Sequence, residues 1–247
     1  MKAIHLLTVP LLAAADLLAA AALPATAGPN DPPKTPLADP KLLAAFQAAC
    51  SERWEAVKET PPYFVAGRDG WMFFGPELRH LSVGPFWGEK AQAVSRATRP
   101  EWADPLPAIL DFHRQLKQAG IDLIVVPVPA KAVIYPAALI GGEPAGRFDP
   151  HHLDFLNLLH NEGVEVLDLT PVFLNNRNMA EGPLYCRQDT HWSGVGCNVA
   201  AAELAARIQR RAWYNDAAKQ KLDSEWYSVR ITGDLWRSAP EPRPDKE

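Results

Sequence analysis

The sequence has few cysteines and no excess of basic residues. Three cysteines among 247 residues are too few for a disulfide-dense small domain, and no C-x-x-C spacing points to a zinc site. The chain has 25 basic and 29 acidic residues and a formal net charge of -4, so it has no electrostatic footprint for nucleic acid. With 47% hydrophobic residues it is long enough to bury a core. We therefore expect a globular protein of enzyme size that does not bind nucleic acid.

Long apolar runs are also missing, except at the N-terminus. Residues 6–23 are almost wholly Leu and Ala, follow Lys2, and precede an A-x-A site at Ala25 and Ala27. This pattern predicts a secretory signal peptide over residues 1–27, with an uncleaved membrane anchor as the alternative. Residues 28–40 are rich in proline and are expected to form a flexible leader. The mature chain is predicted to be periplasmic or secreted.

An exported chain meets an oxidising compartment, where thiols tend to pair. The mature part contains Cys50, Cys186 and Cys197, which allows one disulfide and one free thiol. We expect the disulfide to include Cys50, and the spacing leaves its partner open.

Hydrophobic periodicity predicts an α/β protein. Residues 63–74 are expected to form a strand, a turn and a strand. A helical stripe over residues 106–116 is followed by a β-branched run over 121–128, and a second helix near 153–159 by a strand over 164–169. This alternation favours a parallel sheet with helices on both faces. The predicted domain spans residues 41–238, its last helix begins near residue 195, and residues 239–247 resemble a linker or a truncated end.

The strongest chemical feature is Asp189-Thr190-His191. In an extended stretch, residues two apart point the same way, so the carboxylate and the imidazole are expected to face one cleft. Such a dyad activates a serine hydroxyl in hydrolases and transferases. Two alternatives remain open. The pair is also a possible metal-ligand set, and Ser193 is a good N-cap for a following helix.

Four segments occur in an order that resembles a known family. They are residues 67–74, 125–136, 189–193 and 232–235. Together they resemble the SGNH hydrolase-like domain of the alginate O-acetyltransferases AlgX and AlgJ. The resemblance implies a flavodoxin-like parallel sheet and a periplasmic enzyme that moves acetyl groups onto sugar hydroxyls through a Ser-His-Asp triad, without a cofactor. It assigns Asp189 to orienting the imidazole and His191 to acting as the base.

The chain departs from the family pattern at the nucleophile. The family's serine stands in a Gly-[Asp/Thr]-Ser turn after the Gly-Asp-Leu segment, and no such turn follows here. Ser224, Ser228 and Ser238 lie downstream of His191, but none is in a Gly-x-Ser turn. We interpret the sequence as truncated before the serine and before the last strands of the sheet, with an inactive family member as the alternative.

Several other residues are candidates for substrate binding. Lys131 follows a predicted buried strand and is expected to meet an acidic sugar or an oxyanion, or else to be a solvated loop lysine. Arg79, near the aromatic pair Phe86 and Trp87, is expected to line a sugar groove, although such clusters more often form core. Tyr185 and Trp192, which flank the dyad, are further candidates.

The remaining polar candidates have simpler interpretations. Asp149 is expected to cap a helix that starts with His151 and His152, and Asp168 is expected to be a loop carboxylate. Asp234 has weight only through the family resemblance.

The resemblance implies two partners, an acidic polysaccharide and a membrane-bound protein that donates acetyl groups. Two other functions remain open. One is an exopolysaccharide-binding module without catalysis, and the other is a metal-dependent hydrolase using Asp189 and His191.

Overall fold

The structure is a computed structural model that describes residues 35–223, 225, 227, 229–243, 245 and 246. The predicted signal peptide and most of the predicted leader lie outside these residues. The end of the leader, expected to be flexible, is instead docked. The N–H of Ala38 donates to the Arg147 carbonyl, and the N–H of Arg147 donates to the Pro36 carbonyl. None of the described helices is both long and apolar enough to cross a bilayer.

The N-terminal part combines a long helix with a short hairpin. Helix α1 (Pro40–Val57) begins at Asp39, whose side chain accepts the N–H groups of Lys41 and Leu42. Strands β1 (Phe64–Ala66) and β2 (Met72–Phe74) pair antiparallel, which confirms the predicted strand, turn and strand. Asp69 and Gly70 in the turn have positive φ, a conformation that Gly and Asp tolerate best. Helix α2 (Gly75–Ser82) follows directly and packs on α1.

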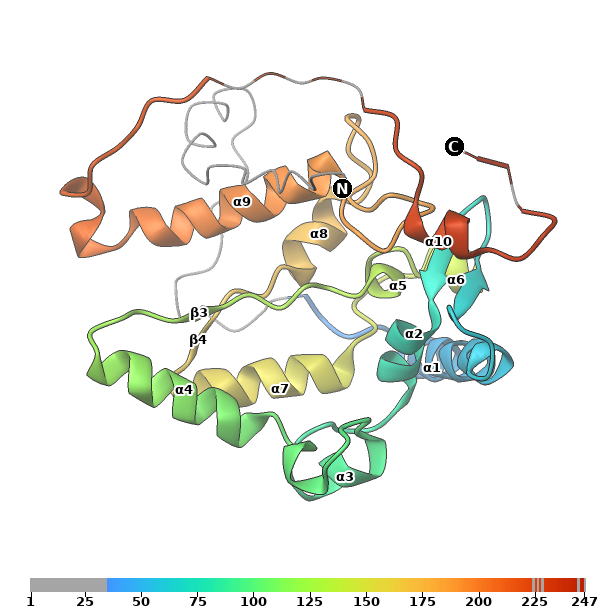
Figure 1. The fold of residues 1–247 in the computed structure, drawn as a ribbon, viewed down its shortest axis with the longest axis horizontal. Helices are drawn as coiled ribbons and strands as arrows, with labels where there is room; N and C mark the ends of the chain where they lie inside the picture. The colour runs from blue at the N-terminus through green and yellow to red at the C-terminus, as the bar shows by residue number, and fades with distance from the viewer. Residues whose placement is uncertain (1–34, 224, 226, 228, 244, 247) are drawn as a thin grey trace, which may run out of the picture.

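The predicted parallel unit is present, with strands shorter than expected (Figure 1). Helix α4 (Leu106–Gln118) leads into β3 (Ile124–Val125), and α7 (Pro150–Asn161) leads into β4 (Glu165–Val166). The two strands pair in parallel, with Ile124 opposite Glu165. Along the chain, α5 (Lys131–Ile134) and α6 (Ala137–Ile140) follow β3 and precede α7. Three short segments precede α4, namely η3 (Gly88–Lys90), α3 (Ala91–Val94) and η4 (Pro100–Trp102).

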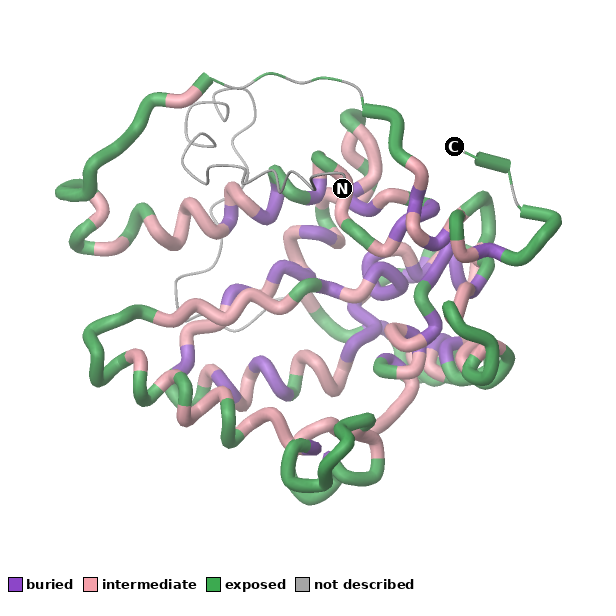
Figure 2. Tube along the Cα trace, viewed as in Figure 1, coloured by how far each residue is buried: buried purple, intermediate pink, exposed green. Residues whose placement is uncertain are grey.

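Side chains alternate between two hydrophobic clusters along β3. Leu123 and Val125 face a cluster formed with α4 and α7, whereas Ile124 and Val126 face the main core. The main core includes Phe173 of α8 (Thr170–Asn176) and Val199 of α9 (Gly194–Gln209). This confirms the prediction of helices on both faces of a parallel sheet. In Figure 2 the buried residues gather around α5 and along the strands.

The C-terminal part returns to the hairpin. Ser193 caps α9 by accepting the N–H of Gly196, which confirms its predicted role. The chain then passes η5 (Ala212–Asn215), and the residues described between 216 and 233 form no helix or strand before α10 (Asp234–Ser238). Helix α10 lies against β2. Residues from the N-terminal, central and C-terminal parts of the domain therefore meet at one end of the molecule.

The structure corrects the role expected for Asp149. This residue precedes α7, but its side chain makes no capping hydrogen bond. Both of its oxygens accept from the guanidinium of Arg147 at 2.8 Å, and Arg147 also donates to Asp168 at 2.5 Å. Arg147 is 0% exposed, and a fully buried cation needs such partners. Asp168 also accepts the N–H of Thr170, so it is a structural carboxylate.

The predicted disulfide is wrong in this structure, where all three cysteines are free. Cys50 lies on α1, fully buried in the main core. Cys186 is partly exposed and its Sγ contacts the Trp192 carbonyl at 3.8 Å, while Cys197 is exposed on α9. The fold encloses Cys50 among apolar side chains instead of presenting it to another thiol.

Candidate active site

The candidate site stands on a tight loop formed by residues 184–193. Tyr185 and Trp192 form an antiparallel bridge at its base. The Ser193 N–H donates to the Leu184 carbonyl, and the Cys186 N–H donates to the His191 carbonyl. Asp189 and His191 therefore lie at the tip of a closed loop that is anchored in the core at Tyr185.

The carboxylate of Asp189 binds the imidazole of His191. The Nδ1 atom of His191 lies 2.7 Å from Asp189 Oδ1, and the same oxygen accepts the His191 backbone N–H at 3.0 Å. The side chain of His191 is 80% exposed, whereas that of Asp189 is 13% exposed. The carboxylate is therefore fixed inside the loop, while the far edge of the imidazole faces solvent.

The two side chains meet for a different reason from the one predicted. Residues 187–191 form turns and bends, not an extended strand. The Asp189 side chain folds onto the backbone two residues ahead, which is a common local bond of Asp in turns. The juxtaposition of the two residues is confirmed, and the strand-like alternation that led to it is wrong.

A second carboxylate completes the arrangement. Asp234, the first residue of α10, accepts the Thr190 N–H at 2.8 Å and the Thr190 hydroxyl at 2.5 Å. Its own N–H donates to Asp189 Oδ2 at 2.8 Å. Its Oδ2 also lies 3.8 Å from His191 Nδ1. Helix α10 is thus joined to all three residues of the Asp189-Thr190-His191 motif.

Hydrogen bonds keep Asp189 ionised. Burial alone would raise its pKa, but the N–H groups of His191 and Asp234 and the imidazole of His191 lower the pKa below the usual value. An acceptor-only carboxylate requires a hydrogen on His191 Nδ1. In the neutral ring the exposed Nε2 then carries the lone pair, which is the form that a general base needs.

The same three residues have the composition of a metal-ligand set. One ligand atom from each of Asp189, His191 and Asp234 lies within 4.8 Å of the other two. Each carboxylate oxygen of the two aspartates accepts a hydrogen bond from the backbone or from Thr190. These bonds hold both carboxylates in place without a cation.

Lys131 lies beneath this loop and not in a solvent-facing groove. It is 2% exposed, and its ammonium group donates to four backbone carbonyls. Its backbone N–H donates to Glu77 Oε1 at 3.1 Å. Burial raises the pKa of Glu77 to about 7, although bonds from Lys131 and Ala132 and the charge of Lys131 oppose this shift. This placement does not fit the expected contact between Lys131 and substrate.

Tyr185 and Trp192, the other two candidates next to the dyad, form the support of the loop. Tyr185 is buried, its hydroxyl donates to the Pro129 carbonyl, and it accepts from Trp192 Nε1 at 2.8 Å. The Trp192 ring packs on Phe173 with centroids 5.4 Å apart. Burial raises the pKa of Tyr185, so its hydroxyl stays protonated. Both side chains point into the core, and a substrate contact for them remains a prediction.

The side chain of Arg79 binds a residue outside the dyad loop. Arg79 lies on α2, and its Nη2 donates to the Val94 carbonyl at 2.7 Å. The neighbouring rings pack inward, with Phe86 4.8 Å and Trp87 5.4 Å from Phe155 between ring centroids. The aromatic cluster is therefore core, the alternative that the sequence left open. The predicted contact between Arg79 and a sugar stays a prediction.

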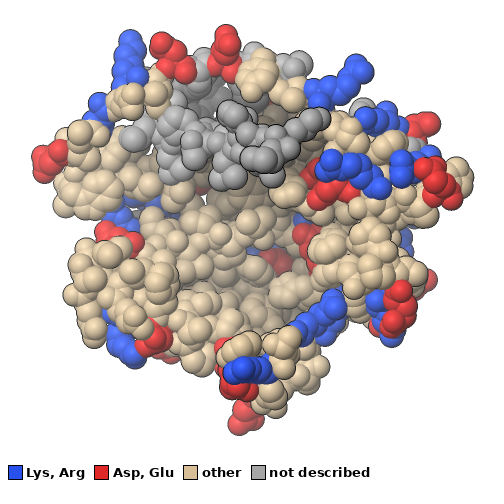
Figure 3. Space-filling model, in the orientation of Figure 1, with Lys and Arg blue, Asp and Glu red and all other residues tan. Residues whose placement is uncertain are grey.

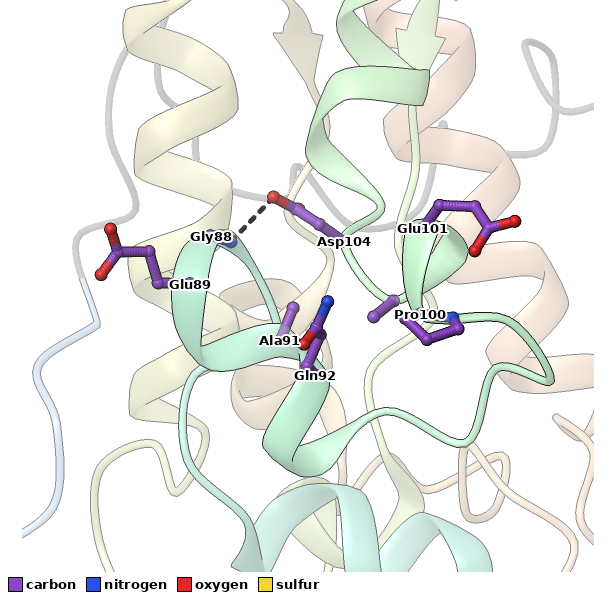
Figure 4. Close-up of a pocket in the computed structure, with 8 residues that line it drawn as sticks. Gly88, Glu89, Ala91, Gln92, Pro100, Glu101 and Asp104 are labelled. Carbon is purple, nitrogen blue, oxygen red and sulfur yellow. Dashed lines mark hydrogen bonds between the residues drawn. The ribbon is translucent and has the colours of Figure 1, made fainter.

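A shallow cavity of about 320 Å³ lies near η3, η4 and the start of α4. In Figure 4 the carboxylates of Glu89 and Glu101 point away from each other, and Asp104 turns to the N–H of Gly88, which it accepts at 2.9 Å. None of its lining residues belongs to the 184–193 loop. The lining of the cavity has no nucleophile beside a general base, so it is not the site.

Figure 3 shows a hollow across the middle of one face, with charged side chains of both signs mainly at its rim.

Sequence reasoning missed part of the support of the site. Thr190 had no assigned role, although both of its polar groups bind Asp234. Gly233 belongs to the 232–235 segment, but the sequence showed no reason for a glycine there. A Cβ at this position would lie 1.9 Å from the Gln188 carbonyl oxygen. Glu77 gave no sequence signal. The Thr232–Leu235 segment was the one signal that pointed to Asp234 and its neighbours.

Comparisons with known proteins identify the family of this chain. The profile of the family described as "SGNH hydrolase-like domain, acetyltransferase AlgX" matches residues 64–246. The chain is 28% identical over 190 residues to a probable alginate O-acetylase AlgJ from Pseudomonas aeruginosa, covering 71% of this chain and 44% of that protein. It is 25% identical over 202 residues to the protein of the same name from Azotobacter vinelandii, covering 76% and 48%. The chain thus spans less than half the length of these curated relatives.

A solved structure shows the same fold. The O-acetyltransferase domain of Pseudomonas putida AlgJ superposes with a TM-score of 0.52 and 26% identity, covering 72% of this chain and 59% of that chain. Residues 64–246, which the family model matches, contain the hairpin, the parallel unit and residues 184–193. The chain therefore belongs to the family of SGNH hydrolase-like acetyltransferase domains typified by AlgX.

Proposed function

We propose that this chain is part of an exported O-acetyltransferase that esterifies hydroxyl groups of an acidic, alginate-like polysaccharide. Family membership supports the reaction class, and the names of the AlgJ relatives support the substrate class. The predicted signal peptide supports a periplasmic or secreted location. Acidic polysaccharide is the proposed acceptor, and a membrane-bound protein is the proposed acetyl donor.

One observation carries the proposal, namely the His191 imidazole held by Asp189 with its far edge in solvent. A carboxylate at 2.7 Å from Nδ1 fixes the tautomer and stabilises the imidazolium that forms when Nε2 takes a proton. The 80% exposure of the His191 side chain leaves room for a hydroxyl nucleophile and an acyl group. A satisfied core histidine would have neither property.

The nucleophile is proposed to be a serine outside the described residues. Of the described serines that follow Asp189 in the chain, Ser193 Oγ donates to the Pro183 carbonyl and Ser238 Oγ donates to the Asp234 carbonyl. Both hydroxyls are therefore engaged away from His191 Nε2. Ser224 and Ser228 are not described.

The proposed reaction has two balanced steps. His191 Nε2 removes the serine proton as the serine oxygen attacks the acetyl carbonyl of the donor, and the imidazolium returns the proton to the leaving group. A sugar hydroxyl then attacks the acetyl-serine and gives its proton to Nε2. The imidazolium finally protonates the serine oxygen as the new ester leaves. Water in place of the sugar gives hydrolysis, so a small acetyl ester is a suitable probe.

The test compares the 247-residue chain with the natural gene product that carries any further residues. Turnover of 4-nitrophenyl acetate is measured for both, and a fluorophosphonate identifies the reactive serine by mass spectrometry. We expect the 247-residue chain to remain at background, and the form that contains the serine to be active. His191→Ala is expected to lower the rate about a thousandfold or more, because nucleophile and base act as one unit.

The matched control is His160→Ala at the end of α7, which is expected to leave the rate unchanged. An active protein whose rate survives His191→Ala would refute the dyad. Activity of the 247-residue chain that depends on His191 would place the nucleophile among its undescribed serines, and the fluorophosphonate would identify it. Polysaccharide binding without turnover in the serine-containing form would favour the binding-module alternative.

A further inference from the structure

The side chain of Lys131 ends in a nest of backbone carbonyls directly under the dyad loop. Its Nζ atom lies 2.8 Å from the Met72 oxygen, 2.7 Å from Cys186, 2.8 Å from Arg187 and 2.9 Å from Asp189. Three of these four carbonyls belong to residues 186–189, which carry the Asp189 side chain. A buried ammonium group without such acceptors would be very unfavourable.

Three segments that are distant in sequence meet at this ammonium group. Lys131 opens α5, Met72 belongs to β2, and Arg187 lies in the dyad loop. The Met72 N–H also donates to the Arg187 carbonyl at 2.9 Å, so β2 and the loop are joined beside the lysine. The ammonium group is therefore the point at which the hairpin, α5 and the dyad loop are held together.

We propose that Lys131 is a positioning residue, whose ammonium group gathers the carbonyls of Cys186, Arg187 and Asp189 and so fixes the loop that presents Asp189 to His191. The proposal rests on the proposed function for its catalytic consequence, but not for its structural one. It replaces the substrate or oxyanion contact expected from the sequence.

The hydrogen-bond count explains why Lys131 acts through the loop. An ammonium group has three hydrogens, and here four carbonyl oxygens share them. No hydrogen is left for an acyl oxygen or a sugar carboxylate. Convergent carbonyl oxygens carry partial negative charge and repel one another unless a cation lies between them. A neutral side chain of the same length therefore cannot keep this loop shape.

The first experiment compares Lys131→Met with Lys90→Met, an exposed lysine on η3. Methionine keeps an unbranched side chain that is one atom shorter and removes all three donors. ¹⁵N NMR reports the tautomer of His191, and hydrogen exchange reports the protection of amides 186–191. In Lys131→Met we expect a mixed tautomer and at least about tenfold faster amide exchange, since one lost bond to a charged group changes an equilibrium by about that factor or more. Lys90→Met should match the unaltered protein.

A folded Lys131→Met variant with the original tautomer and amide protection would overturn the proposal. Circular dichroism checks the fold. A second measurement needs no variant and covers the case in which Lys131→Met does not fold. In the unaltered protein, the ¹⁵Nζ shift of Lys131 and the carbonyl ¹³C shifts of Cys186, Arg187 and Asp189 are followed as pH rises.

These shifts should titrate together, because loss of one ammonium hydrogen leaves too few donors for the carbonyls. Burial lowers the pKa of Lys131 to about 8, while the acidic groups around it, Glu77, Cys186, Asp189 and Asp234, oppose this shift. We expect a common midpoint in that region. Carbonyl shifts that stay constant while Lys131 titrates would overturn the proposal.

Kinetics separate a positioning role from a substrate contact in an active, serine-containing form. Loss of positioning is expected to lower kcat with little change in KM, whereas loss of a substrate contact raises KM. If no form of the protein turns over acetyl esters, the proposed function fails but the NMR measurements still decide the role of Lys131. The two failures are therefore distinguishable.

Discussion

The Oδ1 atom of Asp189 accepts two hydrogen bonds from the same residue, one from the ring Nδ1 of His191 at 2.7 Å and one from its backbone N–H at 3.0 Å. The second bond fixes where the histidine backbone lies, and the first fixes the orientation of its ring. Asp189 therefore sets both the place and the tautomer of the imidazole, although the ring itself is largely in solvent.

Asp189→Asn should abolish most of the activity of a serine-containing form without unfolding it. The amide nitrogen of asparagine can donate to Nδ1, which favours the tautomer with hydrogen on Nε2. A change of this kind in a triad lowers kcat by about 10⁴-fold. Ester hydrolysis and ¹⁵N NMR of His191 test the rate and the tautomer together. An unchanged tautomer would contradict the assigned role of the carboxylate.

Asp234→Ala should loosen the dyad loop. It removes the acceptor of both polar groups of Thr190 while leaving the backbone of α10 able to reach Asp189. We expect a decrease in rate of roughly tenfold or more, since one bond to a charged group contributes about 1.5–3 kcal/mol. Asp216→Ala, at an exposed aspartate after η5, is the control. Equal rates for the two variants would remove Asp234 from the site.

Arg147→Met should destabilise the fold strongly. The change leaves the carboxylates of Asp149 and Asp168 partly buried without their cation, which typically costs about 3–5 kcal/mol. The matched control is Arg114→Met, which breaks an exposed pair with Asp111 and should cost at most about 1 kcal/mol. Urea unfolding followed by circular dichroism measures both free energies of unfolding. Similar values for the two variants would contradict the buried ion cluster.

His80 and His152 should each lower the stability on mild acidification. Burial is the main cause that lowers the pKa of both. At these two residues the unfolded chain binds more protons than the native one below about pH 6.5, so their contribution to the free energy of unfolding falls as pH falls. Glu77 acts in the opposite direction, because burial raises its pKa to about 7 and the native chain keeps its proton there. Melting temperatures between pH 7.5 and 5 test this expectation.

Between pH 7.5 and 5 the double variant His80→Gln/His152→Gln should lose less stability than the unaltered protein, whereas His160→Gln should behave like the unaltered protein. A slope that is the same in all three proteins would assign the effect to other groups. Asp189, whose pKa is lowered, adds to the loss only at lower pH, below the usual aspartate range.

The three thiols should differ widely in reactivity. Cys197 is exposed and should react first with a thiol reagent. Burial raises the pKa of Cys50 to about 12, so Cys50 should react only when the protein unfolds. Mass mapping without reductant should find no disulfide. A bridge that includes Cys50 would restore the pairing expected from the sequence.

Local patterns predicted the framework of the fold well. Turn residues predicted the hairpin around residue 70 and the cap at Ser193. Hydrophobic periodicity predicted that α4 leads into β3 and that α7 leads into β4. The strand lengths were overestimated, because β-branched runs mark buried extended chain and not the length over which a neighbouring strand pairs.

The support of the site was harder to predict, because it depends on contacts between distant segments. The burial of Lys131 arises from carbonyls 55 to 59 residues away, which no local pattern contains. Asp149 is a residue type that often caps helices, but its side chain is oriented by the charge of Arg147, two residues earlier. Asp189 and His191 were predictable because their bond is local.

The docking of α10 onto the dyad loop closes a long loop of chain. Joining Asp234 to Thr190, 44 residues apart, costs roughly 3 kcal/mol in closure entropy. The bonds that offset this cost include two from Thr190 to Asp234, one from Asp234 N–H to Asp189, and one from Trp236 N–H to Gln188. The first three are made to carboxylates, where one bond contributes about 1.5–3 kcal/mol. Together with the burial of Leu235 they exceed the closure cost, so α10 stays bound in the folded protein. The second carboxylate of the site is thus held in place by the same loop that it supports.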